Sequence, residues 1–306
     1  PTGKIDMLPP NRCRAPCPMP HNGAMNYDHA FHAGNHADVL KHLVLLALID
    51  ALARKPAPFF VLDTHAGRGD YALDSSAAQA TGEAALGVRR LHDWSLAQPL
   101  LAPALARYLK AVRPALEARR YPGSPLLAAD TLRENDRLAC CELQPEAAQQ
   151  LRSLFARDPR VGIHQRDGYA ALKALLPPKE KRGLVLIDPP YEAQLAEFDQ
   201  VIDALKEGLA RWPQGIFALW YPIKQRRALA PFYRRAAALP ARSALVAELM
   251  RHADDSPLRL NGSGMLVLNP PWKLDESLLG ALPQMGRALG ETHDPWRLDW
   301  LRREST

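Results

Sequence analysis

The sequence predicts an α/β fold in which helices flank a mostly parallel sheet of seven strands. From Phe59 onward, short apolar stretches alternate with helical stretches, a pattern typical of successive βαβ units. Several of the apolar stretches end at an acidic residue and a turn, as buried strands do where they lead to a ligand site. With 306 residues, 47% of them hydrophobic, the chain is long enough to bury one large core.

The composition favours a polyanionic partner and argues against a membrane or metal protein. The formal net charge is +6, and no apolar run reaches the ~20 residues of a membrane span. The N-terminus lacks the apolar centre of a signal peptide. Cys13 and Cys17 have three residues between them, and Cys140 and Cys141 are adjacent, so no pair has the spacing of a zinc site. We therefore expect a reduced, cytoplasmic protein without metal.

The chain is expected to divide into a disordered tail, residues 1–24, and one folded domain, residues 25–306. The tail is rich in Pro, Asn, Cys, Arg and Gly and has no hydrophobic period. The domain opens with a helix that Asn35 can cap. Its apolar positions recur at helical spacing to about Ala53.

Four of the ten histidines lie between Met25 and the first turns of that helix. His32 and His36 are four residues apart, the spacing of a helical metal-ligand pair, but the general-base Glu of H-E-x-x-H is absent. A capped helix start with polar contacts is the preferred interpretation, and the roles of His29, His32 and His36 stay open.

The first predicted strand, 59–63, ends at Asp63 and runs into a turn containing Gly67 and Gly69. The glycines allow the backbone to approach a ligand closely. A full G-x-G-x-x-G is missing, and the acid ahead of the turn argues against a pyrophosphate. This arrangement suits a ligand that carries a cationic amine and a sulfonium.

A helical insertion is predicted at about residues 76–120, within the first βα unit. The stretch 83–120 has helical periodicity and seven basic residues, which could contact RNA or form only a solvated charged face. Ser124 and Pro125 then resemble an N-cap and first turn, restarting the interrupted helix to about Glu134.

The remaining elements alternate regularly. Strands are predicted at 138–142, 161–166, 184–187, 215–221, 243–251 and 264–268, and helices at 145–155, 169–175, 193–211 and 224–239.

The strand 184–187 leads directly into Asp188-Pro189-Pro190-Tyr191. Asp188 and the carbonyl of Pro189 can accept the two N–H bonds of a base amino group, and Tyr191 can stack on the base. The alternative is a strand end with a solvated acid before a Pro-Pro turn. The tetrapeptide resembles the [DN]-PP-[YFW] signature of amino-group methyltransferases.

Three further strand ends carry acids, and each acid fits a different part of S-adenosylmethionine. Asp63 suits the methionine end, Glu142 can accept from two ribose hydroxyls, and Asp167 can accept from the adenine amino group. Their occurrence at successive strand ends together with Asp188 predicts a site for this cofactor.

From about Met25 to the C-terminus the chain resembles the RlmJ family, bacterial methyltransferases of adenine N6 in 23S ribosomal RNA. The resemblance rests on FHAGNHADVLKH, LDTHAG, YPGSP, RDG, LIDPPYE, ALWYP, NGSGM and NPPWK. It implies a Rossmann-like methyltransferase core with a small helical subdomain. It also implies direct methyl transfer to protein-free 23S rRNA by a monomer.

The resemblance further implies roles for individual residues. Asp188 would accept a proton, Tyr27 would contact the RNA, and Lys41 would act near the site. Cofactor contacts are implied for His42, His65, Ser124, Glu142, Asp167, Gly168 and Asp188.

Other functions remain as alternatives. DNA adenine-N6 and protein glutamine methyltransferases share the [DN]-PP-[YF] chemistry. A non-catalytic RNA-binding protein would keep the basic insertion but has no need of four strand-end acids. The missing third glycine disfavours an NAD oxidoreductase.

Overall fold

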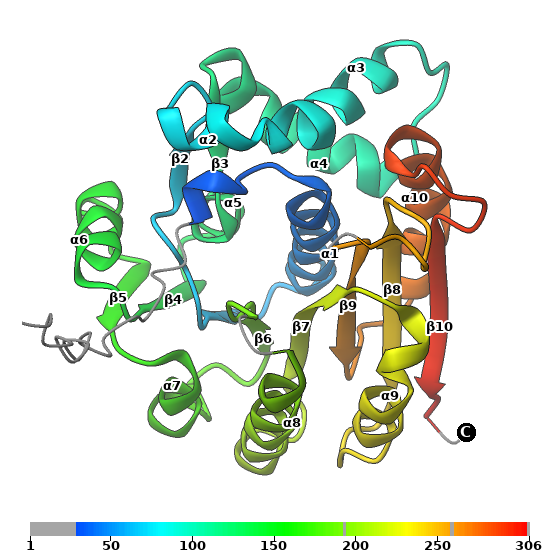
Figure 1. Ribbon diagram of the computed structural model, residues 1–306. Helices are drawn as coiled ribbons and strands as arrows, with labels where there is room; N and C mark the ends of the chain where they lie inside the picture. Colours follow the sequence, from blue (N-terminus) through cyan, green and yellow to red (C-terminus); the bar gives the residue numbers. More distant parts are fainter. Residues whose placement is uncertain (1–28, 192–193, 258–259, 305–306) are drawn as a thin grey trace, which may run out of the picture.

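The computed structural model describes residues 29–191, 194–257 and 260–304. Its main element is an eight-stranded sheet with the order β10-β8-β9-β7-β6-β1-β4-β5 (Figure 1). The strands are β1 (Phe60–Asp63), β4 (Arg137–Glu142), β5 (Val161–Gln165), β6 (Gly183–Ile187), β7 (Ile216–Ile223), β8 (Ala244–Met250), β9 (Gly262–Leu268) and β10 (Trp296–Arg302).

The α/β class and the mostly parallel sheet are as predicted, but the sheet has eight strands instead of seven. Strands β5, β4, β1, β6 and β7 pair in parallel, whereas β9 is antiparallel to both β7 and β8. The additional strand, β10, pairs antiparallel with β8 at the edge. It was missed because its alternation is weak: Arg297 and Asp299 separate three partly buried apolar residues.

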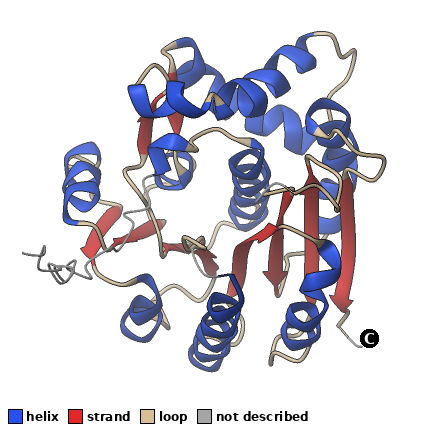
Figure 2. Ribbon diagram, in the orientation of Figure 1, coloured by secondary structure: helices blue, strands red, loops and turns tan. Residues whose placement is uncertain are grey.

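Two helical layers cover the sheet (Figures 1 and 2). Helices α7 (Gly168–Leu175), α8 (Gln194–Arg211) and α9 (Ala230–Ala237) pack on one face. The other face carries α1 (His36–Ala53), α5 (Ser124–Ala129) and α10 (Leu274–Leu289), and α6 (Pro145–Leu154) adds Leu151 to the same core. The helix α10 was not predicted. No helix of the described residues is long and apolar enough to span a membrane.

Helix α1 begins where the sequence predicts. The Oδ1 of Asn35 accepts from the backbone N–H groups of Ala37 and Asp38, at 2.9 Å each. The helix is buried on nearly all sides, between the sheet and the insertion, because its apolar residues extend around its circumference. Polar residues of its first two turns are therefore held inside the protein.

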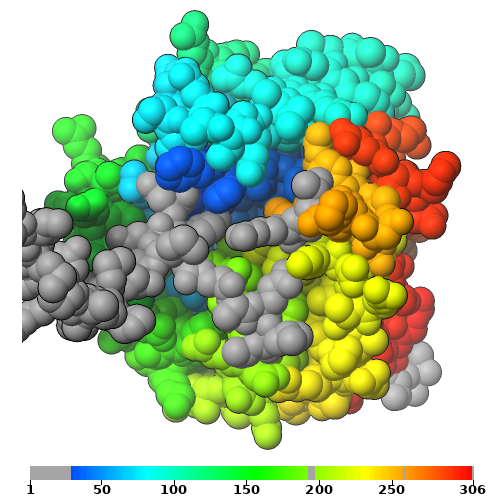
Figure 3. All heavy atoms as spheres, in the orientation of Figure 1, coloured from blue at the N-terminus to red at the C-terminus, as the bar shows by residue number. Residues whose placement is uncertain are grey.

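The insertion lies between β2 (Asp70–Ala72) and β3 (Arg120–Pro122), a short antiparallel pair. It consists of α2 (Ser76–Thr81), a π-helical turn at Ala85–Arg89, α3 (Arg90–Leu96) and α4 (Pro103–Glu117), so the stretch 83–120 is interrupted at 97–102. Buried α4 side chains join the core beneath α1 and α10. Figure 3 shows these helices (cyan) over the blue start of α1. That the insertion is a separate subdomain stays a prediction.

Ser124 is not the N-cap that the sequence predicts. The cap position of α5 belongs to Gly123, no side chain caps the helix, and α5 ends at Ala129 instead of Glu134. The Ser124 hydroxyl is used elsewhere, because it donates to the carboxylate of Asp63.

A second tetrapeptide of the same type, Asn269-Pro270-Pro271-Trp272, follows β9. Because β9 is antiparallel to β7, this turn lies at the sheet edge opposite to the Asp188 turn. Its Asn269 side chain donates to the carbonyls of Pro213 and Gly215, at 2.9 Å each. The second tetrapeptide thus joins two loops of the fold.

Candidate active site

The acids at the carboxyl ends of neighbouring strands lie along one edge of the sheet. Strand β1 pairs with β4 on one side and with β6 on the other, so Asp63 stands between the strands that lead to Glu142 and Asp188. Asp167 follows the next strand, β5, and caps α7. The parallel register therefore places all four predicted carboxylates at one edge.

Asp63 is 2% exposed and is bonded by two groups. The Ser124 hydroxyl donates to its Oδ2 at 2.6 Å, and the backbone N–H of His65 donates to its Oδ1 at 3.3 Å. Burial raises the pKa of Asp63 to about 6, against the opposing effect of the Ser124 bond. A ligand cation beside it would favour the charged carboxylate.

Glu142 and Asp167 hold backbone turns in place. The backbone N–H groups of Gly67 and Gln144 donate to the Glu142 carboxylate at 2.9 and 2.7 Å, and that of Ala170 donates to Asp167 at 2.7 Å. A carboxylate has about four acceptor positions, so each acid keeps some for a ligand.

Gly168 allows α7 to approach the end of β1. A Cβ atom at this position would lie 2.2 Å from the carbonyl oxygen of Thr64 and 3.0 Å from the His65 ring. Such contacts exclude larger residues. The turn that carries Asp167 is therefore held close to the end of β1.

Asp188 is held by Lys41 of α1. The Nζ of Lys41 lies 2.5 Å from Asp188 Oδ2 and 2.7 Å from Oδ1 of Asp38. Burial alone would lower the pKa of Lys41, but these two carboxylates hold it well above its usual value. Lys41 is therefore a cation at neutral pH and links α1 to the Asp188 turn.

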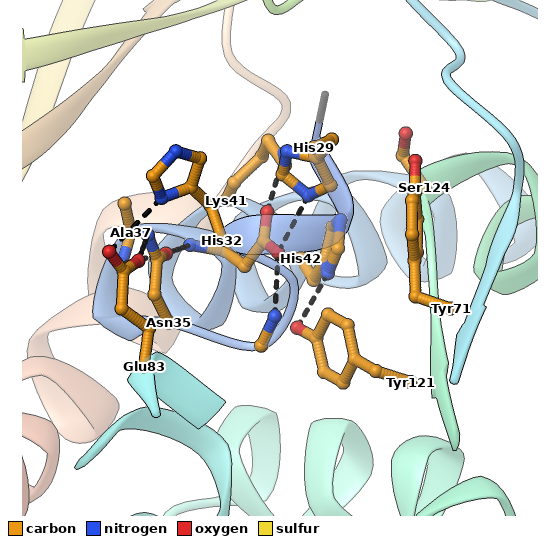
Figure 4. Close-up of polar contacts among 12 residues, drawn as sticks. His29, His32, Asn35, Ala37, Lys41, His42, Tyr71, Glu83, Tyr121 and Ser124 are labelled. Atoms are coloured by element: carbon orange, nitrogen blue, oxygen red, sulfur yellow. Dashed lines mark hydrogen bonds and ion pairs between the residues drawn. The ribbon is translucent and has the colours of Figure 1, made fainter. Parts of the chain in front are cut away.

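Asp38 completes this cluster (Figure 4). Its Oδ2 lies 2.9 Å from Nε2 of His29 and accepts from the backbone N–H of Gly34 at 2.9 Å. Burial opposes its ionisation, yet His29 and Lys41 hold its pKa well below the usual value. Sequence reasoning missed Asp38, although its i,i+3 spacing from Lys41 was a usable signal.

Tyr191 packs into the protein. Its ring lies 5.4 Å from that of Phe198 and 5.7 Å from that of Trp220, between ring centroids, and its hydroxyl donates to the Trp220 carbonyl at 3.1 Å. The preceding Pro189 is buried. Contact of Tyr191 and Pro189 with a base stays a prediction. Tyr27 lies outside the described residues, as does the predicted tail.

The histidines near the start of α1 have separate environments. Nδ1 of His32 lies 3.0 Å from Glu83, whose other oxygen accepts from Asn35 at 2.9 Å. His36 is buried, and burial lowers its pKa to about 4. Within the described ranges, no three His, Cys, Asp or Glu residues cluster as a metal site would require.

Comparison with known proteins identifies the family. The model of the family described as "Ribosomal RNA large subunit methyltransferase D, RlmJ" matches residues 56–302. The chain belongs to the RlmJ family. It is 41% identical over 285 residues to ribosomal RNA large subunit methyltransferase J of Haemophilus influenzae, which covers 92% of this chain and 100% of that protein.

Two further relatives agree with the RlmJ assignment. The protein of the same name from Escherichia coli is 43% identical over 262 residues, covering 85% of this chain and 92% of its own. A crystal structure of a Legionella pneumophila protein is similar with a TM-score of 0.77 and 28% identity, covering 90% of this chain and 99% of that one.

The predicted cofactor residues of this RlmJ chain fit the shape and chemistry of S-adenosylmethionine. Asp63, Glu142 and Asp167 provide acceptors for its ammonium, hydroxyl and amino groups. His42 provides the complement: it is 1% exposed, and its Nε2 has no hydrogen-bond partner among the described residues. A buried polar atom without a partner is costly unless a ligand satisfies it.

Proposed function

We propose that this chain uses S-adenosylmethionine to methylate N6 of a specific adenine in 23S ribosomal RNA. The observation that carries the proposal is the Asp188 turn, joined by a 2.5 Å contact to Lys41 and aligned with Asp63 and Glu142 at one sheet edge. Membership of the RlmJ family supports the same reaction and substrate.

Asp63, Glu142, Asp167 and His42 would bind the cofactor, with Ser124 orienting Asp63. When bound, the cofactor supplies a methyl group activated by its sulfonium. Gly168 and Gly67 keep the surrounding backbone close to the ligand. His65, next to Asp63, would complete the contacts at this end of the site.

Asp188 would orient the amino group and take its proton. Lys41 binds Oδ2, and Oδ1 has no hydrogen bond to any described residue, so Oδ1 is the oxygen open to N6. The Pro189 carbonyl would accept the second N–H. N6 becomes strongly acidic only as the new C–N bond forms, so an ordinary carboxylate suffices as acceptor. The adenine must be unstacked to reach this oxygen.

The RNA would be bound by the basic insertion and by Tyr27, with Tyr191 beside the base. We infer from the family that the substrate is protein-free rRNA, that the enzyme acts as a monomer in the cytoplasm, and that no metal takes part. Exposed arginines of α4 and the following turn can contact phosphates without reading sequence.

Transfer of a labelled methyl group into RNA, DNA or protein tests the proposal. The purified chain should label a protein-free 23S fragment, and nuclease digestion should release the label as N6-methyladenosine. Replacing the target adenine with guanine is the matched substrate control and should abolish labelling. Label in DNA or protein but not in RNA would overturn the proposed substrate.

A further inference from the structure

His42 ends a buried chain of three polar groups. Its Nδ1 lies 2.8 Å from the hydroxyl of Tyr121, which lies 3.1 Å from the hydroxyl of Tyr108 (Figure 4 shows the first contact). Both tyrosines are 0% exposed, and the rings of His42 and Tyr121 stack with centroids 5.5 Å apart. The chain joins α4 of the insertion, β3 and α1.

The direction of these hydrogen bonds follows from counting hydrogens. The Tyr108 hydroxyl has no other acceptor among the described residues, so it donates to the Tyr121 oxygen; the reverse direction would leave a buried O–H without an acceptor. Tyr121 therefore directs its own O–H at Nδ1 of His42. Burial raises the pKa of Tyr121 well above its usual value, so its hydrogen is always present.

This direction fixes the state of His42. Because Nδ1 accepts, the proton of the neutral ring is on Nε2. The ring is neutral because burial lowers the pKa of His42 to about 3. His42 thus presents an N–H donor at the Nε2 atom that has no protein partner in the described part of the chain.

His65 has the opposite tautomer. The Thr64 hydroxyl donates its single hydrogen to the Leu186 carbonyl at 3.0 Å, so it can only accept from Nδ1 of His65, 2.8 Å away. The proton of His65 is therefore on Nδ1, and its Nε2 is an acceptor. Burial lowers the pKa of His65 to about 4, which keeps this ring neutral too.

We propose that Tyr121, oriented by Tyr108, is a positioning residue that keeps His42 an N–H donor for the carboxylate of the cofactor, while Thr64 keeps His65 an acceptor. Every other side chain predicted to bind the ligand directly, apart from Ser124, is an acidic acceptor. The ligand carboxylate is its only anionic group and requires a donor. This inference rests on the proposed use of S-adenosylmethionine.

Nitrogen NMR of the full chain with ¹⁵N-labelled histidine measures both tautomers. The wild type should show His42 protonated on Nε2 and His65 on Nδ1, with signals assigned from His42→Gln and His65→Gln. In Tyr121→Phe, His42 should become a mixture of tautomers while His65 is unchanged. Calorimetric affinity for S-adenosylhomocysteine should fall on the order of tenfold, the effect of one hydrogen bond to a charged group.

Tyr221→Phe is the matched control. It also removes a buried tyrosine hydroxyl, bonded to Glu248 at 2.9 Å, but on the other face of the sheet. It should lower the melting temperature without changing either histidine or the affinity. If Tyr121→Phe fails to fold, Tyr108→Phe serves instead, because it frees the Tyr121 hydroxyl to accept from His42.

The outcomes separate this inference from the proposed function. A wild-type protein that does not bind S-adenosylhomocysteine would overturn the use of the cofactor. A wild type that binds it, but has His42 protonated on Nδ1, would overturn the positioning role alone. The same holds if the folded tyrosine variant keeps both its tautomers and its affinity.

Discussion

Replacing Asp188 with Asn tests the centre of the proposed mechanism. The change keeps the size of the side chain and one acceptor oxygen, but it removes the negative charge and the proton acceptor. Pro189 follows directly and restricts the backbone, so the turn should stay in place. The Asp188 side chain is 15% exposed and that of Lys41 is 5% exposed, so solvent screens their contact only weakly.

The structure indicates a modest loss of stability and a large loss of rate. Removing one partner of a buried ion pair costs about 3–5 kcal/mol when the other is left alone. Here Lys41 keeps Asp38 at 2.7 Å, so we expect about 2 kcal/mol, the range of a hydrogen bond to a charged group. Loss of a general base typically costs about 10²-fold or more in rate, at least about 2.7 kcal/mol of transition-state free energy.

Single-turnover methylation of a 23S fragment measures the rate, and calorimetric titration with S-adenosylhomocysteine measures cofactor binding. We expect the affinity to change by less than about tenfold, so that the defect lies in chemistry. Thermal melting checks that the variant is folded. Turnover near the wild-type rate would show that Asp188 only positions the base and that the proposed proton acceptor is wrong.

Three further predictions concern charge and stacking. Because the pKa of Asp63 is raised to about 6 in the free protein, its contribution to stability is present at low pH and is lost as pH rises through 6; affinity for the cationic ligand should rise over the same interval, with proton release in calorimetry, and Asp63→Asn should abolish both. Changing the exposed Arg113, Arg119 and Arg120 to Glu should weaken RNA binding and reduce the salt slope by about one per lost phosphate contact, while cofactor affinity stays constant; an unchanged slope would leave the insertion a solvated face. Tyr27→Ala should cost about 1–3 kcal/mol in transition-state stabilisation measured from kcat/KM, and Tyr27→Phe should be mild if the ring stacks on the base; equal damage would point to the hydroxyl.

The sequence predicts those parts of the structure that depend on local patterns. Asn35 caps α1 as its residue type indicates, and the strands leading to Asp63, Glu142 and Asp188 lie side by side. Parallel strands separated by helices have few possible arrangements, and their carboxyl ends meet at one edge. A candidate site built on strand ends can therefore be predicted before its side-chain contacts are known.

Contacts between distant segments could not be predicted in the same way. Ser124 has the sequence pattern of an N-cap, but its hydroxyl bonds Asp63, 61 residues away. The pairing of His42 with Tyr121, 79 residues away, depends on how the insertion packs on α1 and leaves no periodic signal. Strand β10 and helix α10 were missed because both have weak patterns near the C-terminus.

The two Pro-Pro tetrapeptides of this chain show a limit of short motifs as functional markers. A search for [DN]-PP-[YFW] would report Asp188 and Asn269 as equal matches, yet they lie at opposite edges of the sheet. Only the direction of the preceding strand separates them. Surveys that count such tetrapeptides in uncharacterised genomes would gain accuracy by scoring strand polarity with the letters.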